Sequence, residues 1–110
     1  MQRAQYTERG PIPQASIAAA DFTLPPLASG QVLIKVLAAP INPSDLLTLT
    51  GVYGMLPPLP AVGGNEGVGV VAACGPGVSA PAVGQTVLLP VGGGTWATHM
   101  VADADKLMPL

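Results

Sequence analysis

Glycine and proline are the features that most limit how this chain can fold. The 110 residues include 14 glycines and 13 prolines, spread over the whole length rather than gathered in one tract. Both residue types destabilise a helix interior, and proline cannot donate a hydrogen bond within a sheet. Short apolar runs rich in β-branched residues lie between them. This pattern predicts short strands joined by tight turns, as in a small barrel or sandwich.

Four apolar runs predict strands directly, and two further runs are weaker candidates. We expect clear strands at Gln31–Ala38, Val68–Ala73, Gln85–Leu89 and Thr95–Ala102, and weaker ones at Ser16–Asp21 and around Tyr6. The connections between them are mostly shorter than about 12 residues, as is usual within one compact domain.

One short helix is also predicted, beginning after Asn42. Asparagine is a favoured N-cap, and Pro43 suits the first helical position. Asp45 falls in the first turn, where the helix dipole favours a negative charge, and we expect it at the surface. Leucines 46, 47 and 49 give the helix an apolar side, and Gly51 ends it.

The charge content is low and rules out some classes of partner. Charged residues make up 9% of the chain, about a third of the usual share, which suggests a surface that is buried against another body. The four Lys and Arg residues are scattered, whereas nucleic-acid binding needs clustered cations. No apolar run reaches the roughly 18 residues of a membrane span, and the N-terminus resembles neither a signal peptide nor a clear presequence. We therefore expect a cytoplasmic protein that binds no nucleic acid and no membrane.

Two stretches match the pattern G-x-G-x-x-(G/A) without the context of a dinucleotide-binding turn. One begins at Gly67 within an expected strand, and the other begins at Gly75 and contains a proline. The functional turn follows a strand and opens a helix. Neither stretch is expected to bind phosphate.

Longer segments resemble a known family. GGNEGVGVV, followed by a Gly-Pro-Gly-Val turn, resembles the N-terminal half of medium-chain dehydrogenase/reductases. Three further segments are more similar to one branch of that family, the trans-2-enoyl thioester reductases of mitochondria and bacteria. They are VLIKVLAAPINPSDLLTLTGVYG, LPPLPAVGGNEG and GGGTWATHMV. The similarity covers roughly residues 3–110.

This resemblance implies a mainly β fold for residues 1–110, a GroES-like, partly open β-barrel with one or two short helices. It also implies an NADPH-dependent reduction of an acyl thioester carried by CoA or an acyl carrier protein, in a full-length enzyme that forms a homodimer. Similar enzymes continue into a Rossmann domain that binds the cofactor. We therefore expect a truncated chain that is inactive alone, and a mitochondrial location if the source is eukaryotic.

Zinc is not expected. Zinc-dependent relatives have Cys in place of Asn42 and His in place of Asn65, and neutral amides are poor zinc ligands. Cys74 and His99 are too few to make a site.

Tyr53 is the residue expected to carry the chemistry. A phenol, whose ordinary pKa is about 10, stays protonated at neutral pH and can act as a general acid. In the similar reductases the tyrosine of this G-x-Y-G segment donates the proton to the substrate α-carbon. Taken without the resemblance, Tyr53 is better explained as a loop residue that caps the barrel edge with its hydroxyl in water.

The resemblance places three further groups at the site. Asn42 would lie near the nicotinamide, beside its role as an N-cap. Gly94, Thr95 and Trp96 would line the cleft, although Trp96 is equally explained as a core residue. Glu66 is expected to be structural, accepting backbone N–H bonds or pairing with Lys35.

Two alternatives stay open. The same superfamily contains quinone and alkenal oxidoreductases, which share the barrel. The chain could also be a non-catalytic GroES-like remnant or an association module, which its low charge would suit.

Overall fold

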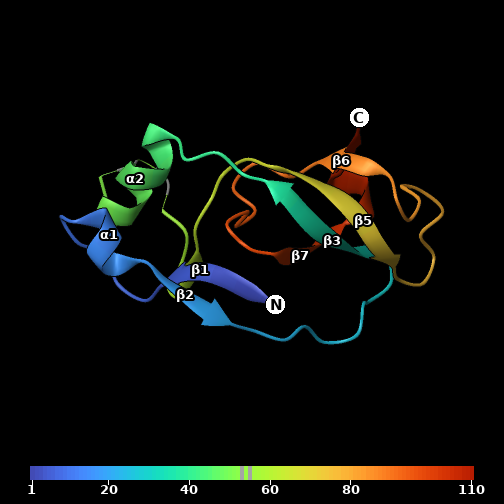
Figure 1. The fold of residues 1–110 in the computed structure, drawn as a ribbon, viewed down its shortest axis with the longest axis horizontal. Helices are drawn as coiled ribbons and strands as arrows, with labels where there is room; N and C mark the ends of the chain where they lie inside the picture. The colour runs from blue at the N-terminus through green and yellow to red at the C-terminus, as the bar shows by residue number, and fades with distance from the viewer. Residues whose placement is uncertain (53, 55) are drawn as a thin grey trace.

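Two antiparallel sheets and two short helices form the chain in the computed structural model, which describes residues 1–52, 54 and 56–110 (Figure 1). The elements in chain order are β1 (Gln2–Tyr6), α1 (Pro13–Ser16), β2 (Ala18–Asp21), β3 (Gln31–Ala38), α2 (Pro43–Thr50), β4 (Ala61–Val62), β5 (Val68–Cys74), β6 (Thr86–Leu88), β7 (His99–Asp103), a 3₁₀ turn (Ala104–Lys106) and β8 (Met108–Pro109). The predicted mainly β class is confirmed. Neither helix in this described part is long and apolar enough to cross a bilayer.

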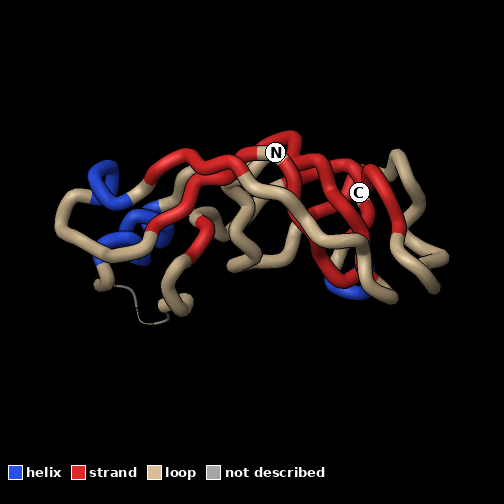
Figure 2. The backbone as a smooth tube through the Cα atoms, turned by 90° about the horizontal axis from the view of Figure 1, so that it is seen from below, coloured by secondary structure: helices blue, strands red, loops and turns tan. Residues whose placement is uncertain are grey.

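The two sheets occupy opposite ends of an elongated molecule that measures 44 × 26 × 20 Å. The smaller sheet has the order β2-β1-β4, and the larger has the order β7-β3-β5-β6-β8. Figures 1 and 2 show both helices beside the smaller sheet, at the end away from the larger one. A β-bridge between Arg3 and Ala97 links the sheets, which do not close into a barrel.

Alternation along β3 and β5 builds the main core. Val32 and Ile34 are fully buried on one face of β3, and Val71 is buried on β5 beside it. Side chains two apart in a strand share a face, so these residues pack on one side of the larger sheet. The whole cluster comprises Val32, Ile34, Val71, Val87, Leu89, Met100, Ala102 and Leu107.

A second, smaller core lies under α2. Tyr6, Leu49 and Ala61 are buried together, with Ile17 and Trp96 packed against them. Leu49 is 2% exposed, whereas the helix's other two central leucines are more than 40% exposed. The apolar side of the helix is therefore narrower than predicted, because Leu49 is the leucine of α2 that is buried.

All the expected strands are present, and three of them are shorter than predicted. The expected strand over residues 95–102 begins only at His99, because residues 95–98 turn to bond with β1 and the segment before β5. Ala4 N–H donates to Trp96 O at 2.8 Å, and Trp96 N–H donates to Gly63 O at 2.9 Å. These bonds hold residues 94–96 against the smaller sheet.

Gly69 provides a test of how tightly β3 and β5 pack. A Cβ at this position would lie 2.4 Å from Ile34 Cγ2 and 2.8 Å from Lys35 O. Gly69→Ala should therefore lower the free energy of unfolding by about 1–3 kcal/mol, as overpacking of a core does. The measurement is urea denaturation followed by circular dichroism.

Gly10→Ala is the matched control, because its Cβ would meet only Ser16 Oγ, at 3.4 Å. It should change the free energy of unfolding by no more than about 0.5 kcal/mol. Equal effects of the two substitutions would contradict the packing explanation.

Candidate functional site

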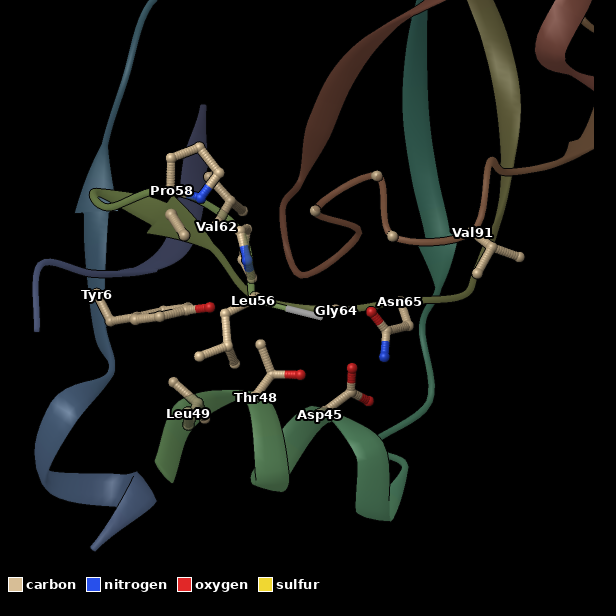
Figure 3. Close-up of a pocket in the computed structure, with 16 residues that line it drawn as sticks. Tyr6, Asp45, Thr48, Leu49, Leu56, Pro58, Val62, Gly64, Asn65 and Val91 are labelled. Carbon is tan, nitrogen blue, oxygen red and sulfur yellow. The ribbon is translucent and has the colours of Figure 1, made fainter. Parts of the chain in front are cut away.

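A cavity of about 670 Å³ lies between α2, β4 and the loop over residues 91–94. The described residues that line it are Tyr6, Asp45, Thr48, Leu49, Leu56, Pro57, Pro58, Ala61 to Asn65 and Val91 to Gly94. Figure 3 shows the side chains of α2 along one side, with the segment that follows β4 across from them. Most of these groups are apolar, and the few polar ones come from α2, Asn65 and Tyr6.

The first turn of α2 holds a buried carboxylate against this cavity. Asp45 is 4% exposed, and its Oδ2 accepts the backbone N–H of Asn42 at 2.7 Å. The first-turn position was predicted correctly, but the expected surface location was wrong. The start of α2 is bonded to Asn65 through Ser44, and Asp45 lines the cavity between them instead of facing solvent.

Two amide side chains tie α2 to the segment before β5. Asn42 Nδ2 donates to Glu66 Oε2 at 2.8 Å, and Asn65 Nδ2 donates to Ser44 Oγ at 3.0 Å. These asparagines occupy the positions where zinc-dependent relatives were expected to carry Cys and His. Each amide nitrogen here is committed to a hydrogen bond. Over residues 1–52, 54 and 56–110, no three His, Cys, Asp or Glu side chains gather as metal ligands.

Gly94, Thr95 and Trp96 take three different positions. Gly94 lines the cavity at φ +76°, with Val62 behind it. Thr95 is fully buried, and its Oγ1 donates to Glu66 O at 2.7 Å.

Trp96 packs behind the cavity wall, where a Cβ added at Gly63 would lie 2.4 Å from its ring. Its indole N–H donates to Pro40 O at 3.1 Å. Of the three residues expected to line the cleft, Gly94 lines the cavity, while Thr95 and Trp96 lie behind it and support the wall.

Tyr53 lies outside the residues that the structure describes, so its role stays a prediction. The chain on either side of it is held by one residue. Arg9 Nε donates to Thr48 O at 3.3 Å, and Arg9 Nη2 donates to Pro57 O. Gly51 ends α2 at φ +84°, as predicted for a C-terminal cap.

Sequence reasoning missed three polar residues of the cavity, namely Tyr6, Thr48 and Asn65 in its lining role. Tyr6 belongs to a strand with weak alternation, QRAQY, which does not reveal which face is buried. Thr48 follows Asp45 by three residues, so both were predictable as neighbours on one helix face. The sequence carries no signal that this face meets Tyr6.

Comparison with known proteins shows the family of this chain. The profile of the alcohol dehydrogenase GroES-like domain matches residues 28–110. The mitochondrial enoyl-[acyl-carrier-protein] reductase of Xenopus tropicalis is 51% identical over 82 residues, which are 74% of this chain and 23% of that protein. The chain thus spans about a quarter of the length of this relative.

Solved structures match nearly the whole chain. The mitochondrial 2-enoyl thioester reductase heterodimer of Candida tropicalis superposes with a TM-score of 0.90 at 33% identity, covering 99% of this chain and 33% of that chain. A complex of Etr1p with NADP and crotonyl-CoA gives the same TM-score at 32% identity, with the same coverage. Escherichia coli quinone oxidoreductase complexed with NADPH gives 0.84 at 28% identity, covering 100% of this chain and 33% of that chain.

The buried carboxylate of Asp45 offers a test of how the site is held. Asp45→Ala should lower the free energy of unfolding by about 1–2 kcal/mol, because the Asn42 N–H loses its partner and the helix loses a first-turn charge. Thermal or urea unfolding measures this loss.

Asp105→Ala is the control, since this exposed carboxylate lies in a three-residue 3₁₀ turn. It should stay within about 0.5 kcal/mol of the native protein. If both substitutions have the same effect, the capping contact of Asp45 is not what stabilises the start of α2.

Proposed function

Because the chain belongs to the alcohol dehydrogenase GroES-like family, we propose that it forms the substrate-side part of an NADPH-dependent trans-2-enoyl thioester reductase. The observation that carries this proposal is the match of 99% of the chain to Etr1p, a protein solved with NADP and crotonyl-CoA. The 51% identity to a mitochondrial enoyl-[acyl-carrier-protein] reductase supports the same substrate class. We assign the whole of residues 1–110 to one GroES-like domain.

The residues present fit the nicotinamide end of such a cofactor. Asn42 uses one N–H of its amide on Glu66, and a side-chain amide nitrogen carries two. The second N–H can donate to a carboxamide oxygen. When bound, NADPH supplies a hydride to the substrate β-carbon.

The chain's own residues then have three tasks. Tyr53 gives its phenolic proton to the α-carbon, which completes the reduction of the double bond. Asn42 orients the reacting groups, and Glu66 holds the Asn42 amide in place through the 2.8 Å hydrogen bond. Gly94, Thr95 and Trp96 form and support the wall along which substrate lies. No zinc is assigned, because the amides of Asn42 and Asn65 are poor zinc ligands.

The remaining assignments follow from the relatives. The similar curated enzyme is mitochondrial, so we propose a mitochondrial location for a eukaryotic source and a cytoplasmic one for a bacterial source. The Candida tropicalis enzyme is a heterodimer, which supports an assembly of two chains, here a homodimer.

Quinone reduction is the second candidate, favoured by the structural match to Escherichia coli quinone oxidoreductase. The two functions differ in what accepts the hydride, a conjugated thioester or a quinone ring. Steady-state oxidation of NADPH with crotonyl-CoA and with 1,4-benzoquinone separates them. The enoyl thioester proposal requires crotonyl-CoA to have the higher kcat/KM.

Tyr53→Phe tests the proton donor in the native protein, expressed from its complete reading frame. The substitution keeps the ring and removes the acidic hydroxyl. It should lower kcat with crotonyl-CoA by about 100-fold or more, because positioned general acids contribute about that much, and should leave KM nearly unchanged. An unchanged kcat would exclude Tyr53 as the acid.

A further inference from the structure

Tyr6 brings a phenol to the cavity. Its side chain is 3% exposed, and its ring packs with Leu49 and Ala61. Figure 3 shows the hydroxyl pointing away from β1 into the space in front of α2. Within the described residues this hydroxyl makes no hydrogen bond, and it opens on the cavity instead.

The ring is held in this direction by its neighbours. The Arg9 guanidinium lies over it, 5.9 Å from the ring centroid. Arg9 is itself fixed by bonds to the carbonyls of Thr48 and Pro57. The Tyr6 hydroxyl therefore faces the cavity, and the ring that carries it packs under a hydrogen-bonded arginine.

Two polar groups of α2 line the same cavity and can only accept hydrogen bonds there, whereas the Tyr6 hydroxyl can also donate one. Thr48 Oγ1 donates its own proton to Ser44 O at 2.8 Å, so toward the cavity it can only accept. The Asp45 carboxylate accepts from the Asn42 N–H with one oxygen and can only accept with the other. The cavity thus has a donor at one end and acceptors along α2.

The walls between these groups are apolar. Leu49, Leu56, Ala61 and Val62 line this part of the cavity. No fully buried side-chain nitrogen or oxygen lacks a partner among the described residues, so the Tyr6 hydroxyl is open to the cavity, where a ligand group can replace water as its partner. A ligand that displaces this water without offering a hydrogen-bond partner is bound more weakly than one that offers it.

We propose that this cavity binds a polar group that both accepts and donates hydrogen bonds and that is carried on an apolar chain, namely a secondary amide or a hydroxyl. Tyr6 donates to its oxygen, while Thr48 or Asp45 accepts its N–H or O–H. This inference rests on the proposed function and identifies the part of the thioester that the cavity binds. The group comes either from an amide of the thiol carrier or from a hydroxylated acyl chain. A simple quinone, which offers only acceptors, leaves Thr48 and Asp45 without partners.

The test combines two ligands with two forms of the native protein, without NADPH so that no turnover occurs. The ligands are the S-ethyl thioester of crotonic acid and its N-acetylcysteamine thioester, which adds one secondary amide. Isothermal titration gives the Kd of each for the native protein and for Tyr6→Phe. The native protein should prefer the amide-bearing ligand, and Tyr6→Phe should reduce that preference about five- to tenfold while leaving the S-ethyl affinity unchanged.

Thr48→Val tests the acceptor side, and Thr50→Val is its matched control. Both threonines lie on α2, and Thr50 Oγ1 also bonds a backbone carbonyl, that of Leu47 at 3.1 Å, but Thr50 does not line the cavity. Thr48→Val should weaken the preference for the amide, and Thr50→Val should not. A third ligand, the 4-hydroxycrotonyl S-ethyl thioester, distinguishes the two sources of the polar group. If Tyr6 discriminates for the hydroxyl and not for the amide, the group belongs to the acyl chain.

Equal weakening of every ligand by Tyr6→Phe, or no effect on any, would overturn the proposal. Failure of every thioester to bind the native protein would overturn the proposed function with it. If the native protein prefers the amide or hydroxyl ligand through Tyr6 but does not reduce crotonyl-CoA, the binding proposal stands and only the proposed reaction is overturned. If Tyr6→Phe does not fold, ¹³Cζ-tyrosine spectra of the native protein replace it, with the Tyr6 signal assigned through Arg9→Lys. That signal should shift with the amide or hydroxyl ligand and not with the S-ethyl ligand.

Discussion

The hydrogen bonds between the start of α2 and residues 65 and 66 decide where the other parts of the cavity lie. Asn42 reaches Glu66 and Asn65 reaches Ser44, so the helix is joined to the segment before β5 at two points. Thr95 adds a third bond, from a fully buried hydroxyl to the Glu66 carbonyl. The Thr95 hydroxyl is fully buried, so losing its acceptor would leave it unpaired, whereas the bond between Asn42 and Glu66 lies at the surface. The arrangement therefore joins α2, residues 65–66 and Thr95.

Glycine makes this close approach possible. A Cβ at Gly64 would lie 2.4 Å from Thr95 Oγ1, and the backbone there has φ +100°, which other residues rarely adopt. At Gly63 the obstacle would be the Trp96 ring. Gly63 and Gly64 therefore allow the side chains of Trp96 and Thr95 to pack directly against the backbone beside the cavity. Gly94 continues this wall, and the function proposed for the cavity depends on it.

How far the sequence predicts this site differs from residue to residue. The helix after Asn42 and its end at Gly51 follow from local preferences of single residues, and both are present. Asp45 lies in the predicted turn but is buried and not at the surface, because the helix dipole favours the turn and does not determine what packs over it. The strand expected from Thr95 starts only at His99, because tertiary bonds to β1 and Gly63 hold residues 95–98 in another conformation. Tyr6 was missed because its burial depends on α2, which lies more than 35 residues further along the chain.

By itself the sequence determined the mainly β class, the positions of β3, β5 and α2, and the family to which the chain belongs. These depend on short-range preferences and on motifs that can be read along the chain. Only the tertiary structure decided which polar groups face one another: a phenol from β1, a carboxylate and a hydroxyl from α2, and an amide from the segment after β4 (Figure 3). The physical reason is that hydrogen-bond donors and acceptors are matched across space. The residues of α2 do not predict that the helix contacts β1, and the residues of β1 do not predict that the strand contacts α2.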